Sequence, residues 1–487
     1  MSMQLELELG TAEEGVNKTP SDGARAGHRR SAQARAQRKT KAKDRNAQTA
    51  TMEEIVERLE EAFEAVAANK GAPGPDRQSI QRVREHLPEL LPALSQALLE
   101  GAYQPGDIRR VWIPKAGGGQ RGLGIPNVVD RMVQEAIRRA LEPLYEPTFH
   151  PSSHGFRPGR SCHTAISQAR EHLADGREWV VDIDLENFFN KVNHQRLMAR
   201  LAMRVQDKRL LQLIGKMLKA QIVMPDGVVV SNEEGVPQGG PLSPLLSNIV
   251  LDELDWKLHE RGHHFVRYAD DCNIYVRSER AGHRVMASVS DFIQRRLRLK
   301  VNASKSGVAQ PQERHFLGFS LRRTPLDGSV EVGLSERTRE RIDSKIRELT
   351  PRGWGSSLKA CIDKINVYIT GWTSFFGICT EQVERTLQTL DAHIRRRLRA
   401  IQLKQWKRKR TIVRKLIQLG IRAKTAWRNV YEGRRSLWAL SHTQAVNRAL
   451  KNSHWDERGL KTLTQRYWAH PARVVAQESA QSALAFG

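Results

Sequence analysis

Tyr268-Ala269-Asp270-Asp271 is the stretch of this sequence that decides the fold. Residues 264–267 and 273–276 on either side are rich in β-forming side chains, so the four residues are predicted to form the tip of a hairpin. Two adjacent ionised Asp residues repel each other, and a bound cation or a catalytic role usually accounts for such a pair. Carboxylates without nearby His or Cys favour Mg²⁺. A solvated acidic turn is the alternative that the rest of the sequence has to exclude.

Length and composition limit the class of protein. A chain of 487 residues with 39% hydrophobic residues predicts two or three domains with sizeable cores. No run of about 18 uncharged apolar residues occurs, so we expect no membrane span. The cysteines form no Cys-x-x-Cys pair, which favours a reducing cytoplasm and argues against a cysteine-bound zinc. They are Cys162, Cys272, Cys361 and Cys379.

The charge of the chain is strongly positive and unevenly distributed. The net charge is +25, with an isoelectric point near 10.3. Residues 391–430 contain fourteen Lys and Arg residues and one acid, so they carry over half of the excess. Residues 25–45 contain nine more, against Asp44 alone. Charge that only increases solubility would be spread and mixed, so clustering of this kind favours a nucleic acid as partner.

The distribution of secondary structure indicates an α+β fold. Residues 1–50 have no apolar period and are expected to be a disordered basic arm. Residues 51–330 mix helices and strands, and after residue 335 only helices are predicted. The predicted strands and hairpins are at 109–114 with 123–125, 179–185, 222–224 with 228–230, and 316–321. The main predicted helices are at 127–144, 195–219, 242–259, 281–299, 337–349, 356–371, 382–406 and 411–419.

A second acidic position lies upstream of the hairpin. Asp182 and Asp184 alternate on the predicted strand 179–185 and therefore project from one face. Asp184 is expected to meet Asp270 on an adjacent strand. Three converging carboxylates hold two Mg²⁺ ions in enzymes that transfer phosphoryl or nucleotidyl groups. We interpret Asp182 as a structural, supporting carboxylate.

Two further elements suit nucleotide binding. Residues 235–244, Gly-Val-Pro-Gln-Gly-Gly-Pro-Leu-Ser-Pro, allow close backbone approach immediately before a predicted helix. Lys115 and Arg121 flank a glycine turn, with Arg109 nearby, and paired cations on a hairpin suit a triphosphate. Taken alone, the first element is also compatible with a plain turn and the second with a basic surface loop.

The order of these motifs resembles that of the reverse transcriptases encoded by bacterial group II introns. After the basic hairpin come Asp-Leu-Glu-Asn-Phe-Phe, the glycine-proline loop, Tyr-Ala-Asp-Asp, Leu-Lys-Val-Asn-Ala-Ser-Lys-Ser and Phe-Leu-Gly-Phe. The resemblance extends from about residue 69 to residue 420. It implies a right-hand polymerase, with fingers and an antiparallel palm sheet at 51–330 and an all-α thumb or maturase domain at 331–430.

The resemblance also implies roles for single residues. Asp184, Asp270 and Asp271 match the catalytic, metal-binding aspartates. The residues that match the binding site for the incoming deoxynucleotide are Lys115, Arg121, Arg109, Phe189, Gln238 and Lys305. Among these, Phe189 matches an aromatic that excludes the wrong sugar. Gln238 and Gly239 would lie beside the nascent base pair, and Tyr268 would touch the primer terminus. Asn190 departs from the family pattern, which usually has an acid there.

The helical region is expected to bind RNA. Its predicted RNA-binding residues are Arg395, Arg396, Arg397, Arg399, Lys407, Arg408, Lys409 and Arg410. Cationic helices interleaved with Trp and Phe neutralise phosphates, whereas Trp372, Phe375 and Phe376 are expected to pack in the core. Residues 431–487 are interpreted as a small DNA-contacting segment. They lack the cysteine pairs and His-Asn-His spacing of the family's endonuclease, so no endonuclease domain is expected.

The combined prediction is an RNA-directed DNA polymerase that uses Mg²⁺. Its partners would be a group II intron RNA, a DNA target that supplies the primer, and deoxynucleoside triphosphates. The protein would assist splicing and retrohoming by target-primed reverse transcription, in the bacterial cytoplasm and on the nucleoid when bound to DNA. Two alternatives remain: a domesticated reverse transcriptase in defence or repair, and an RNA-binding splicing cofactor without polymerase activity.

Overall fold

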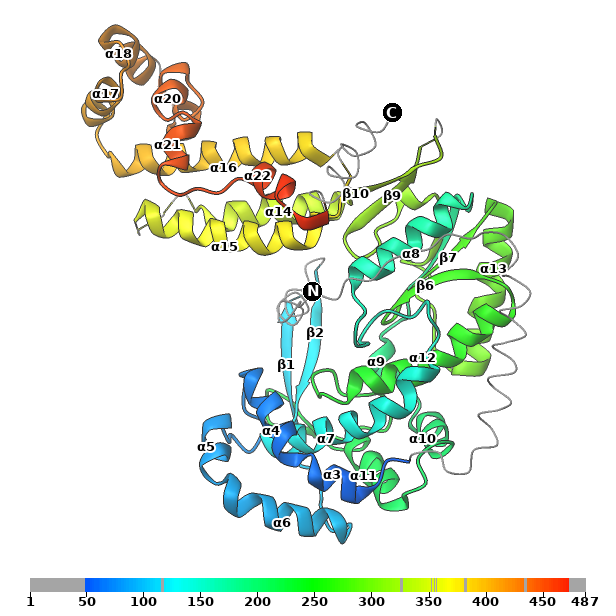
Figure 1. The fold of residues 1–487 in the computed structure, drawn as a ribbon. Coiled ribbons are helices and arrows are strands. Elements are labelled where there is room, and N and C mark those ends of the chain that lie inside the picture. The colour runs from blue at the N-terminus through cyan, green and yellow to red at the C-terminus, as the bar shows by residue number, and fades with distance from the viewer. Residues whose placement is uncertain are drawn as a thin grey trace, which may run out of the picture. The chain divides into compact units, whose positions relative to one another are not determined.

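The structure is a computed structural model. It describes residues 49–114, 118–324, 327–351, 353, 355, 357–380, 383–432 and 436–472. The expected basic arm, apart from its last two residues, and Lys115 lie outside the described residues. Ala50–Gly487 form one compact unit, to which all the elements below belong (Figure 1).

The N-terminal helices pack around one long, buried helix. That helix is α7 (Val128–Tyr145), and its residues Met132, Val133 and Ile137 are completely buried. The helices that precede it are α3 (Met52–Glu57), α4 (Leu59–Ala68), α5 (Ile80–Glu85) and α6 (Leu87–Leu99). Leu59 and Phe63, four residues apart on one face of α4, both enter this core.

Two predicted hairpins join into one four-stranded sheet. Its order is β2-β1-β4-β5. The strands are β1 (Ile108–Pro114), β2 (Gln120–Ile125), β4 (Ile222–Val223) and β5 (Val229–Val230). The parallel pairing of β1 with β4, which links the hairpins, was not predicted from the sequence. Arg109 pairs with Ile125 and Arg121 with Ile113, so the two arginines share a face at opposite ends of the β1–β2 hairpin.

The acidic motifs lie on a second sheet, whose order is β6-β7-β3-β8. Its strands are β3 (Trp179–Ile183), β6 (His264–Tyr268), β7 (Asp271–Val276) and β8 (Gly307–Ala309), and every pair is antiparallel. The predicted hairpin at 264–276 is therefore present. It lies beside β3, which is the strand that leads into Asp184.

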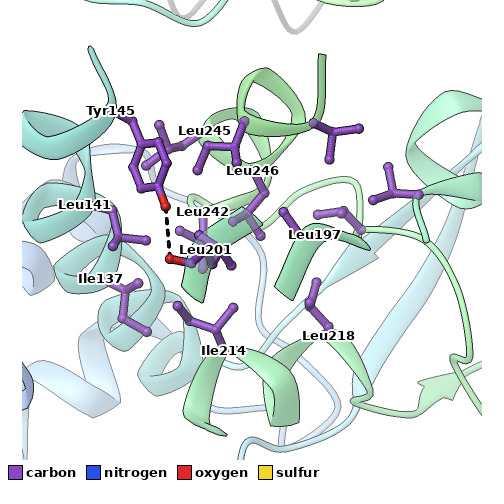
Figure 2. Packing of buried hydrophobic residues seen from close by; sticks show 14 of the residues in the cluster. Ile137, Leu141, Tyr145, Leu197, Leu201, Ile214, Leu218, Leu242, Leu245 and Leu246 are labelled. Atoms are coloured by element: carbon purple, nitrogen blue, oxygen red, sulfur yellow. Dashed lines mark hydrogen bonds between the residues drawn. The ribbon is translucent and has the colours of Figure 1, made fainter. Parts of the chain in front are cut away.

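One helix prediction was wrong. Residues 195–219 form two helices, α10 (His194–Ala202) and α11 (Lys208–Leu218), instead of one. The chain turns between them because Asp207 caps α11, where its carboxylate accepts hydrogen bonds from the backbone N–H groups of Arg209 and Leu210. The apolar spacing continues across the turn, which explains the error. Both helices pack with α7 and α12 (Ser243–Glu260), and the Tyr145 hydroxyl donates to the carbonyl of Leu201 at 3.4 Å (Figure 2).

Most of the remaining helices and strands form a second hydrophobic core. It buries one face of α8 (Cys162–Ala174), the hairpin β9 (Phe319–Arg323) and β10 (Val330–Leu334), and the C-terminal helices. Trp372 and Phe376 are buried in it and Phe375 is partly buried, which agrees with the expected core packing. The other elements are α9 (Phe188–Lys191), α13 (Glu279–Phe292) and the π-helical turn Ile293–Leu297, which pack in the first core, and the single-turn helices Glu146–Thr148 and Pro311–Glu313.

The C-terminal part of the described chain is helical, as predicted. Its helices are α14 (Glu336–Leu349), α15 (Leu358–Phe376), α16 (Glu384–Gln405), α17 (Lys409–Gln418), α18 (Ala423–Tyr431), α19 (Leu437–Leu440), α20 (Gln444–Ala449), α21 (Asn452–Asp456) and α22 (Leu463–Trp468). None of the helices in the described ranges is long and apolar enough to cross a membrane. All four cysteines are free and buried.

Candidate active site

The acidic hairpin has a two-residue loop. Tyr268 pairs with Asp271, so Ala269 and Asp270 alone connect β6 to β7. Ala269 has a φ of +55°, in the left-handed region that tight hairpin loops require. An L-residue with a Cβ atom adopts this conformation at a cost of about 1–2 kcal/mol, so the surrounding structure has to hold the loop in place.

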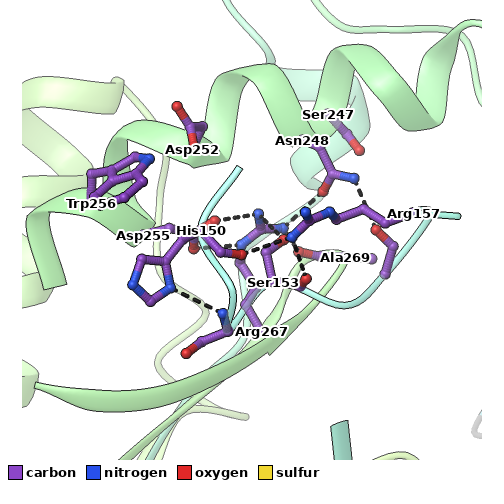
Figure 3. A network of polar contacts seen from close by, with 12 residues as sticks. His150, Ser153, Arg157, Ser247, Asn248, Asp252, Asp255, Trp256, Arg267 and Ala269 are labelled. Carbon is purple, nitrogen blue, oxygen red and sulfur yellow. Dashed lines mark hydrogen bonds and ion pairs between the residues drawn. The ribbon is translucent and has the colours of Figure 1, made fainter. Parts of the chain in front are cut away.

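Arg267 supports the loop from the protein interior (Figure 3). Its guanidinium is completely buried and donates to the carbonyl of Ala269 at 2.8 Å. The same group pairs with both carboxylate oxygens of Asp255, at 2.7 and 2.5 Å. It also donates to Asn248 Oδ1 and Ser153 Oγ. Burial alone would lower the pKa of Arg267, but Asp255 outweighs it, so the pKa lies above its usual value and the side chain stays charged.

The segment that precedes α8 packs against the same loop. Asn248 on α12 donates to the carbonyl of Gly155 at 2.8 Å. A Cβ atom on Gly155 would lie 2.3 Å from the backbone nitrogen of Ala269, so only glycine allows this approach. Arg157 fixes the segment by donating to the carbonyls of His150 and Ser153. The hairpin tip is therefore held from two sides.

The three predicted carboxylates gather at one end of the sheet. Ile183, the last residue of β3, pairs with Cys272, so Asp184 follows at the end of the sheet where Asp271 begins β7. Burial, together with Asp270, Asp182 and Asp184, raises the pKa of Asp271 to about 8. Burial and Asp184 also raise the pKa of Asp270. Like charges are thus concentrated where little water reaches them, which is the condition that a bound cation relieves.

Lys305 is the cation nearest to Asp184. Its Nζ lies 3.3 and 3.4 Å from the two carboxylate oxygens of Asp184. The backbone N–H of Asp184 donates to Ser306 Oγ, and the carbonyl of Asp184 accepts from the backbone of Asn302. Within the described residues, no three His, Cys, Asp or Glu side chains already have the spacing of a metal centre. The structure therefore brings the carboxylates together without arranging them around a shared point.

The glycine-proline loop packs directly against strand β2. The carbonyl of Gln238 accepts from the backbone of Gly124 at 2.7 Å, and Arg121 Nε donates to Gln238 Oε1 at 2.7 Å. Gly239 has a φ of +130°, and a Cβ atom there would lie 2.5 Å from the carbonyl oxygen of Gly124. Arg121 is also close enough to Asp270 to counteract the rise in its pKa. The structure thus connects the loop, the basic hairpin and the acidic hairpin.

Not every predicted site residue joins this group. Phe189 is 8% exposed and packs edge to face against Phe188, while its carbonyl accepts from Val236 in the glycine-proline loop. Tyr268 is partly buried opposite Asp271. Arg109 lies at the far end of the hairpin from Arg121, and its Nε is buried without a hydrogen-bond partner in the described ranges.

Sequence reasoning missed the residues that support the hairpin. Arg267 is an isolated charge in an otherwise apolar strand, a pattern that requires a buried partner. Asn248 and Asp255 are seven residues apart and therefore share a face of the predicted helix at 242–259. These two signals together would have indicated the network.

Comparison with known families agrees with this site. Residues 113–321 match the family described as reverse transcriptase (RNA-dependent DNA polymerase), and residues 339–417 match the group II intron, maturase-specific domain. Protein YkfC of Escherichia coli (strain K12) is 34% identical over 350 residues, which are 63% of this chain and 89% of that protein. The chain belongs to the group II intron-type reverse transcriptases. The predicted family and the predicted enzyme class, an RNA-directed DNA polymerase, are confirmed.

Relatives of this reverse transcriptase include intron-encoded proteins. The group II intron-encoded protein LtrA of Lactococcus lactis subsp. cremoris is 41% identical over 168 residues, or 34% of this chain and 28% of that protein. The putative COX1/OXI3 intron 2 protein of Saccharomyces cerevisiae is 29% identical over 290 residues, or 48% of this chain and 34% of that protein. The alignments thus span about a third or less of both intron proteins.

The basic residues of the reverse transcriptase's helical part fall into two groups. Lys407, Arg408, Lys409 and Arg410 are exposed, the first two between α16 and α17 and the last two at the start of α17. The arginines on α16 are more enclosed. Arg396 lies 4.0 Å above the ring of Trp438, and Arg397 donates to the carbonyl of Thr350. Arg399 is only 9% exposed and donates to the carbonyl of Ser441. The predicted RNA-binding block is therefore not one continuous exposed surface.

Arg267→Met tests the support of the hairpin. It leaves Asp255 buried without a counter-charge and is expected to lower the free energy of unfolding by about 3–5 kcal/mol. Arg267→Met combined with Asp255→Leu should recover most of that stability, because no unpaired charge is left. Primer extension should stay low in both variants, because Ala269 has lost its donor. Denaturant unfolding and primer extension measure the two effects, and full polymerase activity in the double variant would contradict this role.

Proposed function

We propose that this reverse transcriptase copies a group II intron RNA into DNA from a primer on its DNA target, and that it binds the same RNA to assist splicing. One observation carries the polymerase part. Asp184, Asp270 and Asp271 gather where Lys305, Arg121 and Gln238 also meet, although these residues come from five separate segments of the chain. We assign residues 51–330 to fingers and palm, 331–430 to the thumb and 431–487 to DNA contact.

The donor set fits divalent magnesium. It consists of carboxylates, the hard oxygen ligands that Mg²⁺ prefers, and burial together with neighbouring carboxylates raises the pKa values of Asp270 and Asp271. Asp184, Asp270 and Asp271 would hold the metal. Bound there, Mg²⁺ would favour ionisation of the primer 3′-hydroxyl and neutralise the departing pyrophosphate.

The chain's own side chains would position the nucleotide. Arg121 and Lys305 both act electrostatically on Asp270, and this proximity supports the proposal that both bind triphosphate oxygens. The hydrogen bond from Arg121 fixes the amide of Gln238 next to Gly239, where a base pair would rest against bare backbone. Phe189, whose carbonyl accepts a hydrogen bond from the same loop, would exclude nucleotides with the wrong sugar. Lys115, Arg109 and Tyr268 remain predicted contacts to nucleotide or primer.

The RNA-binding part rests on the exposed cations and a neighbouring aromatic pair. Trp427 and Tyr431 on α18 are 46% and 41% exposed, and their rings stack with centroids 5.0 Å apart. Lys409 Nζ lies 5.3 Å from the Tyr431 ring. Exposed aromatics next to cations bind unpaired bases and backbone together. Lys407–Arg410 and this aromatic pair are therefore our proposed RNA surface.

A second function is favoured by one comparison. The name of YkfC, which aligns over most of its length, does not mention an intron, whereas the name of LtrA does. This supports a reverse transcriptase that acts apart from an intron, for example in defence or repair. The DNA that flanks the coding sequence separates the two functions, because only an intron-encoded enzyme lies within a folded catalytic intron RNA.

Asp270→Asn and Asp271→Asn test the polymerase site. Each is expected to reduce primer extension on an RNA template by about a hundredfold to a thousandfold or more, the scale on which a preorganised charge contributes to catalysis. RNA affinity should change little, and Asp363→Asn on the exposed face of α15 is the control. Wild-type extension rates in either variant would contradict the assignment of that residue to the polymerase site.

Arg121→Gln tests the binding of the triphosphate. Loss of a charge-assisted contact is expected to raise the KM for the deoxynucleotide about tenfold, with a smaller change in kcat. Arg295→Gln, an exposed change of the same kind on the π-helical turn after α13, should leave both constants unaltered. Steady-state extension at varied nucleotide concentration makes the comparison. An unchanged KM would contradict the assignment.

Replacing Lys407, Arg408, Lys409 and Arg410 together by Gln tests the RNA surface. Each lost phosphate contact is expected to reduce the slope of log K against log salt by about 0.7 on single-stranded RNA. Binding titrations at several salt concentrations measure this slope. Identical slopes for the variant and the wild type would show that these cations do not contact RNA.

A further inference from the structure

A basic hollow lies on the helical part of the molecule, away from Lys407–Arg410. It has a volume of about 590 Å³, in the range of pockets that hold small ligands. Three of its lining residues are cations, three have polar side chains, and no acid lines it in the part of the chain that the structure describes. The lining residues are Ala392, Arg395, Arg399, Asn447, Lys451, Asn452 and Ser453.

Arg399 is the most enclosed of the three cations that line this hollow. It follows Arg395 by four residues on α16, so both side chains occupy the same face of the helix. Arg399 is 9% exposed, and in the described chain its one hydrogen bond runs from Nε to the carbonyl of Ser441. Burial, together with the neighbouring Arg395 and Arg396, lowers its pKa to about 10. No carboxylate acts against this decrease.

Each of the other buried arginines in the described chain has an acid acting on it, which for Arg131 is Asp76 without an ion pair. Arg267 pairs with Asp255, and Arg157 pairs with Glu146 at 2.7 Å. The nearest acid on α16 is Asp391, but its carboxylate already accepts the backbone N–H groups of Leu463 and Thr464 at 2.8 and 3.1 Å. A desolvated cation without a counter-charge is costly, so a site of this kind favours a bound anion.

We propose that this hollow is a phosphate pocket, in which Arg395, Arg399 and Lys451 bind one backbone phosphate of a nucleic acid. Guanidinium groups match phosphate oxygens in geometry, and Lys451 adds a compact charge. The side chains of Asn452 and Ser453 can donate further hydrogen bonds. The proposal deepens the proposed RNA-binding function and rests on it, but it places a single recessed contact where the sequence suggested only a charged surface.

Inorganic phosphate is the first probe, in chloride buffer at constant ionic strength. Phosphate is expected to raise the thermal unfolding midpoint of the wild-type protein and of Arg448→Gln, a matched loss of charge on the exposed face of α20. Arg399→Met and Arg395→Gln should lose this shift. Without phosphate, Arg399→Met should unfold at the wild-type temperature or above it, because a neutral side chain of similar length relieves an unpaired charge.

RNA binding is the second readout. For a single-stranded RNA, Arg399→Met and Arg395→Gln are each expected to lower affinity about tenfold, as for one lost charge-assisted contact, and to reduce the salt slope by about 0.7. Arg448→Gln should change neither. A DNA oligonucleotide of the same sequence shows whether the backbone phosphate comes from RNA or from DNA.

The outcomes separate this pocket from the general RNA-binding function. Stabilisation by phosphate with unchanged affinity for both nucleic acids in the Arg395 and Arg399 variants would mean an adventitious ion only and would overturn the proposal. Absence of any phosphate shift in the wild type, together with unchanged affinities, would overturn it as well, while the Lys407–Arg410 surface could still bind RNA. If Arg399→Met fails to fold, Arg395→Gln decides, because that side chain is only partly buried.

Discussion

The buried pair of Arg267 and Asp255 is the interaction on which the polymerase site depends. Both side chains are fully enclosed, and removal of two charges from water costs several kcal/mol per ion unless every polar atom is satisfied. Arg267 meets that requirement with hydrogen bonds to Asp255, Asn248, Ser153 and Ala269. A half-formed network would be worse than an apolar core. Its members, from α12, β6 and the segment before α8, are therefore fixed together.

The same network explains how the acidic loop tolerates its own charge. Asp270 and Asp271 are partly buried beside Asp184, and their burial, together with Asp184, raises the pKa of both. A mobile loop would swing these carboxylates into water. Here the Ala269 carbonyl accepts a hydrogen bond from Arg267, and Gly155 packs against the loop backbone. The loop therefore keeps its strained conformation and its mutually repelling carboxylates in one arrangement. Preorganised charge of this kind is what a nucleotidyl-transfer site needs, because no reorganisation remains for the reaction step.

The sequence predicted the features that depend on local patterns. The hairpin at 264–276, the strand before Asp184 and the C-terminal helices follow from periodicity and turn residues within each segment. The break at Asp207 escaped detection because a capping acid interrupted the helix without interrupting its apolar spacing. The parallel pairing of β1 with β4 escaped because the strands are about a hundred residues apart in sequence and only the fold brings them together.

Burial was the other quantity that the sequence did not reveal. In the linear pattern, Arg399 and Arg410 are equivalent members of one basic run. In the structure, the packing of α16 against the residues around Ser441 encloses the first and leaves the second exposed. An exposed cation exchanges water for a phosphate at little cost, whereas an enclosed one has already lost its water. A bound phosphate therefore stabilises the two sites in different ways. At the exposed run it releases condensed counterions, whereas at the enclosed arginine it supplies the counter-charge that the described protein residues do not provide.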